Sequence, residues 1–212
     1  MDADSFVTEV EEAKATELDR LGSQQSLVAL TDADLDAESV LRAAARSERV
    51  ARETFAEWAE TEANADASEA FAGLARQETD HYERVVAELG DEAEDFGPEG
   101  PDPMHEYLRG LDSTVERAAG LVGRSLASER TQLQVVNFFV NDADERRADC
   151  FRELRAETQD GISAGAELLE ETCDGEDDWE RARKTAEETV RVAYDDYAET
   201  LEGMGLDPRP IC

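Results

Sequence analysis

Proline placement is the feature of this sequence that most constrains its fold. All five prolines fall at positions 98, 101, 103, 208 and 210, so residues 1–97 and 104–207 lack the strongest helix breaker. Within these two stretches apolar residues recur at spacings of three and four, and no sustained alternation indicates a β-strand. The chain is therefore predicted to be all-α.

Interruptions of the apolar spacing divide the chain into six predicted helices. They are expected at residues 4–21, 36–64, 67–89, 113–140, 143–173 and 177–204, with a short turn of helix at 104–111. Asp36 is the expected N-cap of the second helix. The middle four are each about 35 to 47 Å long at 1.5 Å per residue. Two long hairpins joined by a longer crossover predict a four-helix bundle, with one additional helix at each end.

The length of 212 residues fits one helical domain. The sequence begins without the basic region and apolar run of a signal peptide, and its longest apolar run is too short to span a membrane. We therefore expect a cytoplasmic protein. Its expected parts are an N-terminal helix and loop (1–35), a first helix pair (36–89), a linker (90–103), a second helix pair (104–173), and a C-terminal helix and tail (174–212).

The charge of the chain is strongly acidic. Acidic residues number 54 and basic residues 21, which gives a formal net charge of -33 at pH 7. The apolar content is still 40%, too high for a disordered acidic tail. We interpret the charge as halophilic adaptation, because molar salt shortens the Debye length to about 3 Å and screens the repulsion. Without a Lys/Arg cluster, neither nucleic acid nor a membrane surface is an expected partner.

Several common site types find no support in the sequence. Cys150, Cys173 and Cys212 form no C-x-x-C pair, which argues against a disulfide framework and against a rubredoxin-type iron site. The chain also lacks a phosphate-binding loop and a dinucleotide fingerprint. Of its two histidines, His105 follows the proline-rich linker and is expected to be a surface or capping residue.

Three acidic residues interrupt the apolar stripes near the middles of their helices. Glu48 occupies an inward position in the second helix, Glu78 and His81 share the inward face of the third, and Glu129 does the same in the fourth. Antiparallel helices of similar length meet at their midpoints, so these four side chains are expected to converge in the core. Unpaired buried carboxylates are costly, so a cation is expected between them.

A core-facing glutamate followed by Glu-x-x-His on the next helix resembles the rubrerythrins of the ferritin-like superfamily. The likeness is best in SERVARETF at 47–55 and FAGLARQETDHYE at 71–83. It implies a ferritin-like bundle that binds iron or manganese and acts as an oxidoreductase on peroxide or iron. Many rubrerythrins pass electrons through a rubredoxin domain, which is not found in this sequence, so the resemblance implies an external electron donor. The resemblance is also compatible with a homo-oligomer.

The second half of the chain repeats the first but lacks part of its ligand set. Ser-Glu-Arg at 128–130 corresponds to Ser-Glu-Arg at 47–49, and carrying that register forward puts Thr158 and Gly161 where a second Glu-x-x-His would stand. The metal ligands are thus expected to be Glu48, Glu78, His81 and Glu129, holding at most one ion per chain.

Two further features of the fifth helix follow from this register. Glu157 and Asp160 lie about 100° from its inward stripe, so they are expected outside the cluster. Gly161 and Gly165 are four residues apart and are expected to form a notch that lets a neighbouring helix approach.

Two classes of function remain open. In the first, carboxylates and His81 hold iron or manganese in a metal-dependent oxidoreductase, because these metals accept oxygen and imidazole ligands. In the second, the chain is a non-catalytic helical bundle, a structural or interaction module whose vestigial polar core is held by Arg or water and contains no metal. The metal content of natively purified protein separates the two.

The halophilic interpretation predicts a dependence on salt. Lowering the salt below about 0.5 M is expected to destabilise the fold, because the repulsion among excess negative charges is no longer screened. Thermal melting followed by helical circular dichroism measures this. An unchanged melting temperature between dilute buffer and molar salt would contradict the interpretation.

Overall fold

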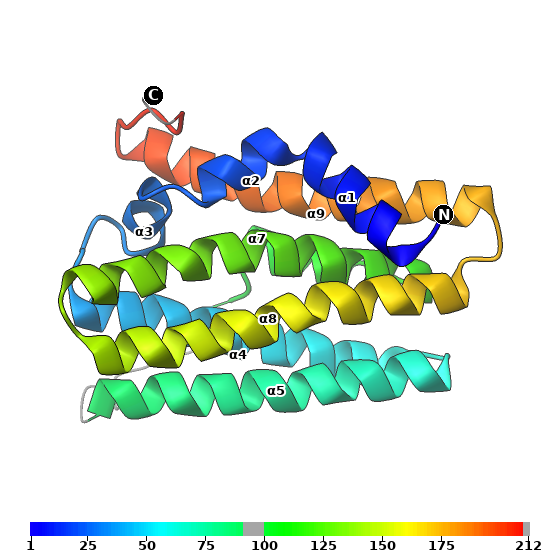
Figure 1. Ribbon diagram of the computed structural model, residues 1–212, viewed down its shortest axis with the longest axis horizontal. Helices are drawn as coiled ribbons and strands as arrows, with labels where there is room; N and C mark the ends of the chain where they lie inside the picture. The colour runs from blue at the N-terminus through cyan, green and yellow to red at the C-terminus, as the bar shows by residue number, and fades with distance from the viewer. Residues whose placement is uncertain (91–99, 210–212) are drawn as a thin grey trace.

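The computed structural model describes residues 1–90 and 100–209 of the chain (Figure 1). Its described part is helical throughout, with no strand among those residues. Most of the predicted linker, 90–103, and the tail end with Cys212 lie outside the described residues. The helices are α1 (Ala3–Ala13), α2 (Ala15–Leu21), α3 (Gln25–Leu30), α4 (Ala37–Thr61), α5 (Ala65–Leu89), α6 (Pro103–Arg109), α7 (Thr114–Asn141), α8 (Glu145–Thr172) and α9 (Glu176–Gly203).

The five long helices confirm the prediction from apolar spacing. Each of α4, α5, α7, α8 and α9 begins and ends within a few residues of its expected range, and α6 is the expected short turn of helix. Asp36 is the N-cap of α4, because its carboxylate accepts a hydrogen bond of 2.9 Å from the backbone N–H of Ser39. Local sequence signals therefore determine these boundaries.

The N-terminal region differs from the single helix expected at residues 4–21. It is broken at Lys14 into α1 and α2, and a further short helix, α3, follows. Lys14 falls on the same face as Phe6, Val10 and Leu18, which are buried, and its ammonium pairs with Glu17 at 3.2 Å. The break thus occurs where a charged residue interrupts the buried stripe.

The long helices form two hairpins that pack into a helical bundle (Figure 1). One hairpin joins α4 to α5 and the other joins α7 to α8, while α9 packs along α7. The N-terminal helices lie mainly against α7, α8 and α9, and α3 also contacts α4 of the first hairpin. Helix α7 is consequently central, and residues 118–127 are buried on all its faces.

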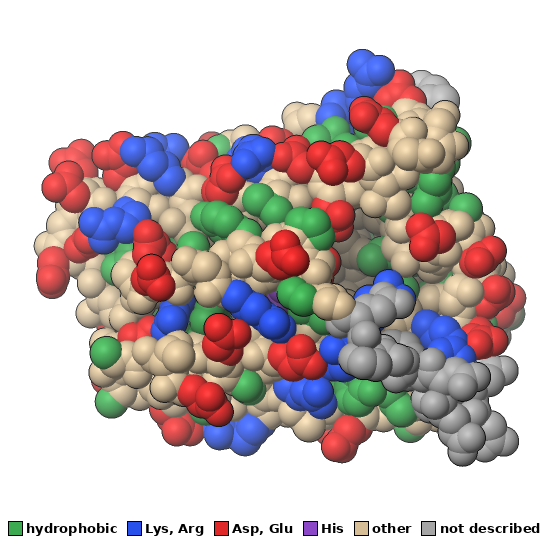
Figure 2. All heavy atoms as spheres, turned by 180° about the vertical axis from the view of Figure 1, so that it is seen from behind, with side chains coloured by type: hydrophobic (Ala, Val, Ile, Leu, Met, Phe, Trp, Pro, Cys, Tyr) green, Lys and Arg blue, Asp and Glu red, His purple; other side chains and the backbone are tan. Residues whose placement is uncertain are grey.

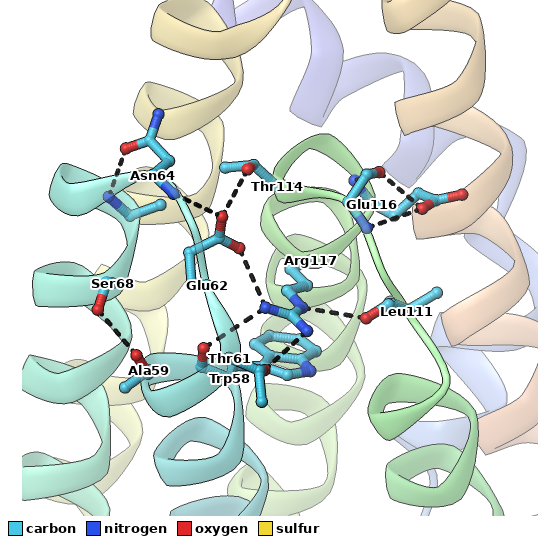
Figure 3. A network of polar contacts seen from close by, with 12 residues as sticks. Trp58, Ala59, Thr61, Glu62, Asn64, Ser68, Leu111, Thr114, Glu116 and Arg117 are labelled. Atoms are coloured by element: carbon cyan, nitrogen blue, oxygen red, sulfur yellow. Dashed lines mark hydrogen bonds and ion pairs between the residues drawn. The ribbon is translucent and has the colours of Figure 1, made fainter.

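A buried ion pair fixes the first hairpin to α7 at one end of the bundle (Figure 3). The guanidinium of Arg117, on α7, lies 3.1 Å from the Glu62 carboxylate after α4, and both side chains are buried. Arg117 also donates to the carbonyl oxygen of Leu111 and to the hydroxyl of Thr61 at 3.0 and 2.9 Å. Because several donors of Arg117 are used at once, the relative position of α4 and α7 is well defined.

Acidic side chains are scattered over the face shown in Figure 2, interleaved with basic ones. This distribution is that of a solvated surface, with many of the charges paired at helical spacing, as in Glu38 with Arg42 and Glu187 with Arg183. None of the described helices combines the length and the apolar composition that a membrane span requires.

The predicted glycine notch on α8 is confirmed. A Cβ atom at Gly165 would lie 2.8 Å from the carbonyl oxygen of Ala118, and one at Gly161 would lie 2.8 Å from the Ser125 hydroxyl oxygen. Real Cβ atoms do not approach so closely, so α7 and α8 pack at a separation that only glycine permits at these positions.

Gly165→Ala is expected to destabilise the protein by about 1–3 kcal/mol, because the added methyl group meets backbone in a close-packed interface. Gly73→Ala is the matched control on α5. The nearest atom to a Cβ there is the mobile Arg76 Nη2 at 3.8 Å. This control is expected to gain up to about 1 kcal/mol of helix propensity. Urea unfolding measures both, and equal effects would contradict the close packing.

Candidate metal centre

Three of the four predicted ligands meet in the core of the bundle. Glu48 extends from the middle of α4, and Glu78 and His81 extend from α5 one turn apart. The exposed fractions of their side chains are 3%, 1% and 0%. One potential ligand atom from each residue lies within 4.8 Å of the others, and this is the one such group of His, Cys, Asp or Glu found in the described parts of the chain.

The potential ligand atoms face one another without forming close hydrogen bonds. His81 Nδ1 is 3.6 Å from Glu48 Oε2 and 3.5 Å from Glu78 Oε2. None of these three buried atoms has a hydrogen-bond partner among the residues that the structure describes. Buried polar atoms are normally paired, so three adjacent unpaired atoms indicate that a cation fits between them.

Arg124 is the functional residue that the sequence analysis missed. It extends from α7, is 2% exposed, and its Nη1 lies 2.9 Å from Glu78 Oε1. Its guanidinium also lies 5.4 Å from the centre of the Phe55 ring, where a cation–π contact stabilises the charge. The signal was present in the sequence, because Arg124 is the only charged residue between positions 118 and 128.

The buried charges shift the protonation of the cluster. Burial alone would raise the pKa of Glu78, but the positive charge of Arg124 outweighs it and holds this pKa far below its usual value. For Glu48, burial and the neighbouring Glu78 charge raise the pKa to about 7. Burial would lower the pKa of His81, but the Glu48 and Glu78 carboxylates outweigh it and raise this pKa to about 10. Without a metal, His81 is therefore a buried imidazolium at neutral pH.

Glu157 lies outside the group of close ligand atoms, as expected, but its carboxylate contacts that group, which was not expected. Its Oε2 is 2.8 Å from His81 Nε2, on the opposite side of the ring from Glu48 and Glu78. The side chain is 40% exposed and its other oxygen pairs with Arg84 at 3.3 Å. A rotation of 100° on α8 does not exclude contact, because Glu157 reaches α5 along the α5–α8 seam. Asp160 is exposed, as expected.

Glu129 is buried, but it does not belong to the group of close ligand atoms. Its carboxylate lies between Arg155 Nη2 at 2.6 Å and Arg130 Nε at 2.8 Å. These two arginines hold the Glu129 carboxylate away from Glu48, Glu78 and His81.

In the second half of the bundle, the positions where a second Glu-x-x-His would stand hold residues that pack against the neighbouring helix. Thr158 and Gly161 are buried and face inward, as the register predicts. Gly161 abuts Ser125 of α7, so there is no space at that position for an imidazole. Close packing of α7 against α8 therefore fills the position that a second histidine ligand would occupy.

His105 belongs to a helix cap, as expected, but it is buried rather than on the surface. Its backbone N–H and its ring Nδ1 contact the carboxylate of Asp102, the N-cap of α6, at 2.9 and 2.7 Å. The charge of His105 and these contacts lower the pKa of Asp102 in spite of the burial that would raise it. His105 therefore stabilises the beginning of α6.

Comparison with known proteins adds no relative to this picture. Neither the protein-family models, nor the curated proteins, nor the solved structures contain a match to the chain. What the chain does must therefore be argued from its own helical bundle and from its buried Glu48, Glu78 and His81 cluster.

The shifted pKa values predict how the stability of metal-free protein depends on pH. The folded-state pKa of His81, about 10, lies above its ordinary value of 6.5, so the protonated ring stabilises the fold below pH 6.5. This contribution is lost as the pH rises through about 10. The raised pKa of Glu48 acts in the same direction, because the folded state favours its proton up to about pH 7.

The measurement is urea unfolding of chelator-treated protein across this pH range, in parallel with His81→Gln. The wild type is expected to exceed the variant in stability most at the acidic end, with the difference shrinking towards pH 10. A difference that is constant with pH would contradict a raised pKa of His81.

Proposed function

We propose that this protein binds one divalent cation, iron(II) or manganese(II), through Glu48, Glu78 and His81, in a bundle of the ferritin-like kind. The observation that carries the proposal is the set of three unpaired buried ligand atoms within 4.8 Å of one another. Two carboxylate oxygens and one imidazole nitrogen form a donor set that suits these metals. The arrangement is similar to the Glu and Glu-x-x-His pattern of rubrerythrins.

The surroundings of His81 support this assignment. Histidine ligands in metal sites commonly donate their second N–H to a carboxylate, which fixes the tautomer and the ring orientation. Glu157 occupies that position on Nε2, which leaves Nδ1 directed at Glu48 and Glu78. A bound cation takes the place of the proton on Nδ1, so metal binding releases a proton and strengthens as the pH rises.

The charges of the cluster limit the number of ions to one. Glu78 is already paired with the buried guanidinium of Arg124 at 2.9 Å. A second divalent cation would be repelled by Arg124 and by the first ion in a low-dielectric interior. Glu129, the remaining buried carboxylate that was predicted as a ligand, is neutralised by Arg155 and Arg130. We therefore propose Glu157, rather than Glu129, as the fourth functional carboxylate.

An oxidoreductase acting on peroxide or on iron itself is the activity that we propose for this site. A bound iron or manganese ion supplies one-electron redox chemistry there. The protein contributes a buried site, since Glu48, Glu78 and His81 are almost completely buried, and Glu157 holds the imidazole in place. Because no second metal-ligand group occurs in the described residues, an external electron donor is part of the proposal.

A non-catalytic bundle with a vestigial site is the second candidate, and one observation favours it. Without any metal, the positive charges of Arg124 and protonated His81 lie against the Glu78 and Glu48 carboxylates and compensate their negative charge. A structural or interaction module would keep such a cluster only for packing. Metal content distinguishes this candidate from the first.

We expect elemental analysis of natively purified protein to find no more than one equivalent of iron or manganese per chain. His81→Ala and Glu78→Gln remove a ligand and are expected to abolish tight binding. Glu157→Gln removes the partner of His81 Nε2 and is expected to weaken metal affinity by about 10–100-fold.

Glu129→Gln is the matched control, since the same change is made to a buried carboxylate away from the cluster. It is expected to leave the metal content unchanged. Two equivalents that survive dialysis would show that the second half of the bundle contributes ligands after all. Absence of metal under every loading condition would favour the non-catalytic module.

A further inference from the structure

A cavity leads from the surface to the buried cluster. It has a volume of about 400 Å³ and is lined by residues of α3, α4, α7 and α9, by Phe151 of α8 and by the segment 100–104. The molecule is hollowed on this side (Figure 2). Its inner wall includes Glu48, one of the proposed metal ligands. The volume falls within the range of about 300–1,000 Å³ that small-molecule sites occupy.

The cavity exists because small side chains line the two helices that face each other across it. Ala43, Ala44 and Ser47 line it on α4, and Ala127 and Ser128 line it on α7. The rest of the wall is largely aliphatic. Leu21, Leu27, Leu30, Val40, Val50, Met104 and Val135 contribute to it. An elongated apolar molecule can therefore bury its surface here, and each Å² of apolar surface removed from water contributes about 25 cal/mol to the free energy of binding.

Besides the Glu48 carboxylate, the cavity lining includes a second hydrogen-bond acceptor without a partner in the described residues, the side-chain oxygen of Gln132. Gln132 is 9% exposed. Its Nε2 donates to Glu48 Oε1 at 3.4 Å, which assigns the orientation of the amide. Its Oε1 has no hydrogen-bond partner anywhere in residues 1–90 and 100–209. A ligand with a hydroxyl group can donate to this oxygen.

The charge of the lining selects against an anionic ligand. Three carboxylates border the cavity, those of Glu48, Asp102 and Asp196, together with the single guanidinium of Arg46. Burial and the neighbouring Asp102 charge raise the pKa of Asp196. A fatty acid carboxylate would enter an acidic lining in a protein with net charge -33, whereas an alcohol carries no charge.

We propose that this cavity binds an uncharged aliphatic alcohol, with the chain along the apolar wall and the hydroxyl donating to Gln132 Oε1. The binding itself does not require a metal. Glu48 is shared between the cavity and the cluster, so a bound alcohol would lie beside the metal centre that we propose.

The test is calorimetric titration of the full-length, chelator-treated protein in molar salt with octanol, octane and octanoate. Octanol is expected to bind saturably at one site with a negative heat-capacity change, and octanoate at least about tenfold more weakly. Ala44→Leu and Ala127→Leu fill part of the cavity and are each expected to weaken octanol binding about tenfold or more, since the added carbon atoms take the place of part of the alkyl chain.

Ala156→Leu, the same change on the exposed face of α8, is the matched control and is expected to leave octanol binding unchanged. Gln132→Leu is expected to bring the affinity for octanol down to that for octane. Helical circular dichroism checks that each variant folds. If a variant does not fold, the titration of the wild type with the three probes still tests the proposal.

Octanol that fails to saturate, or octanoate that binds as tightly as octanol, would overturn the proposal. Equal octanol affinity in the wild type and a folded cavity-filled variant would do the same. Because the titration uses metal-free protein, octanol binding without any metal content would refute only the metal centre. Metal content without octanol binding would refute only the cavity.

Discussion

The contact between Arg124 and Glu78 is the interaction on which the interior of this protein depends. A guanidinium and a carboxylate that are 2% and 1% exposed meet at 2.9 Å in the middle of the bundle. Both ions lose their hydration, so each is tolerable only while the other is in place. This pair joins α5 of the first hairpin to α7 of the second hairpin, at the level of Glu48 and His81.

The remaining features of the core can be understood from that pair. Arg124 compensates one of the two buried negative charges, and His81 compensates the other with a proton when no metal is bound. In the site that we propose, a divalent ion would replace that proton, and the fixed positive charge of Arg124 would repel a second ion. The shape of the bundle allows the arrangement, because Gly161 and Gly165 bring α8 close to α7 and close the second ligand position.

Packing and chemistry are also linked on the other side of Glu48. The small residues Ala44 and Ala127 line the cavity between α4 and α7, and Glu48 of the cluster lines it as well. Elsewhere on the same helices, the Arg117–Glu62 ion pair holds α4 and α7 together (Figure 3). The bundle therefore places a space for a small molecule beside one of its buried carboxylates.

The sequence by itself determined the helical content, the boundaries of the long helices and the inward placement of Glu48, Glu78 and His81. These follow from helical periodicity and capping, which are local properties. Only the tertiary structure decided which charge stands opposite each carboxylate. Arg124 reaches Glu78, Arg155 takes Glu129 out of the cluster, and Glu157 reaches His81 across the α5–α8 seam. Long side chains extend between helices, and their partners depend on helix packing that spacing along a single helix does not encode.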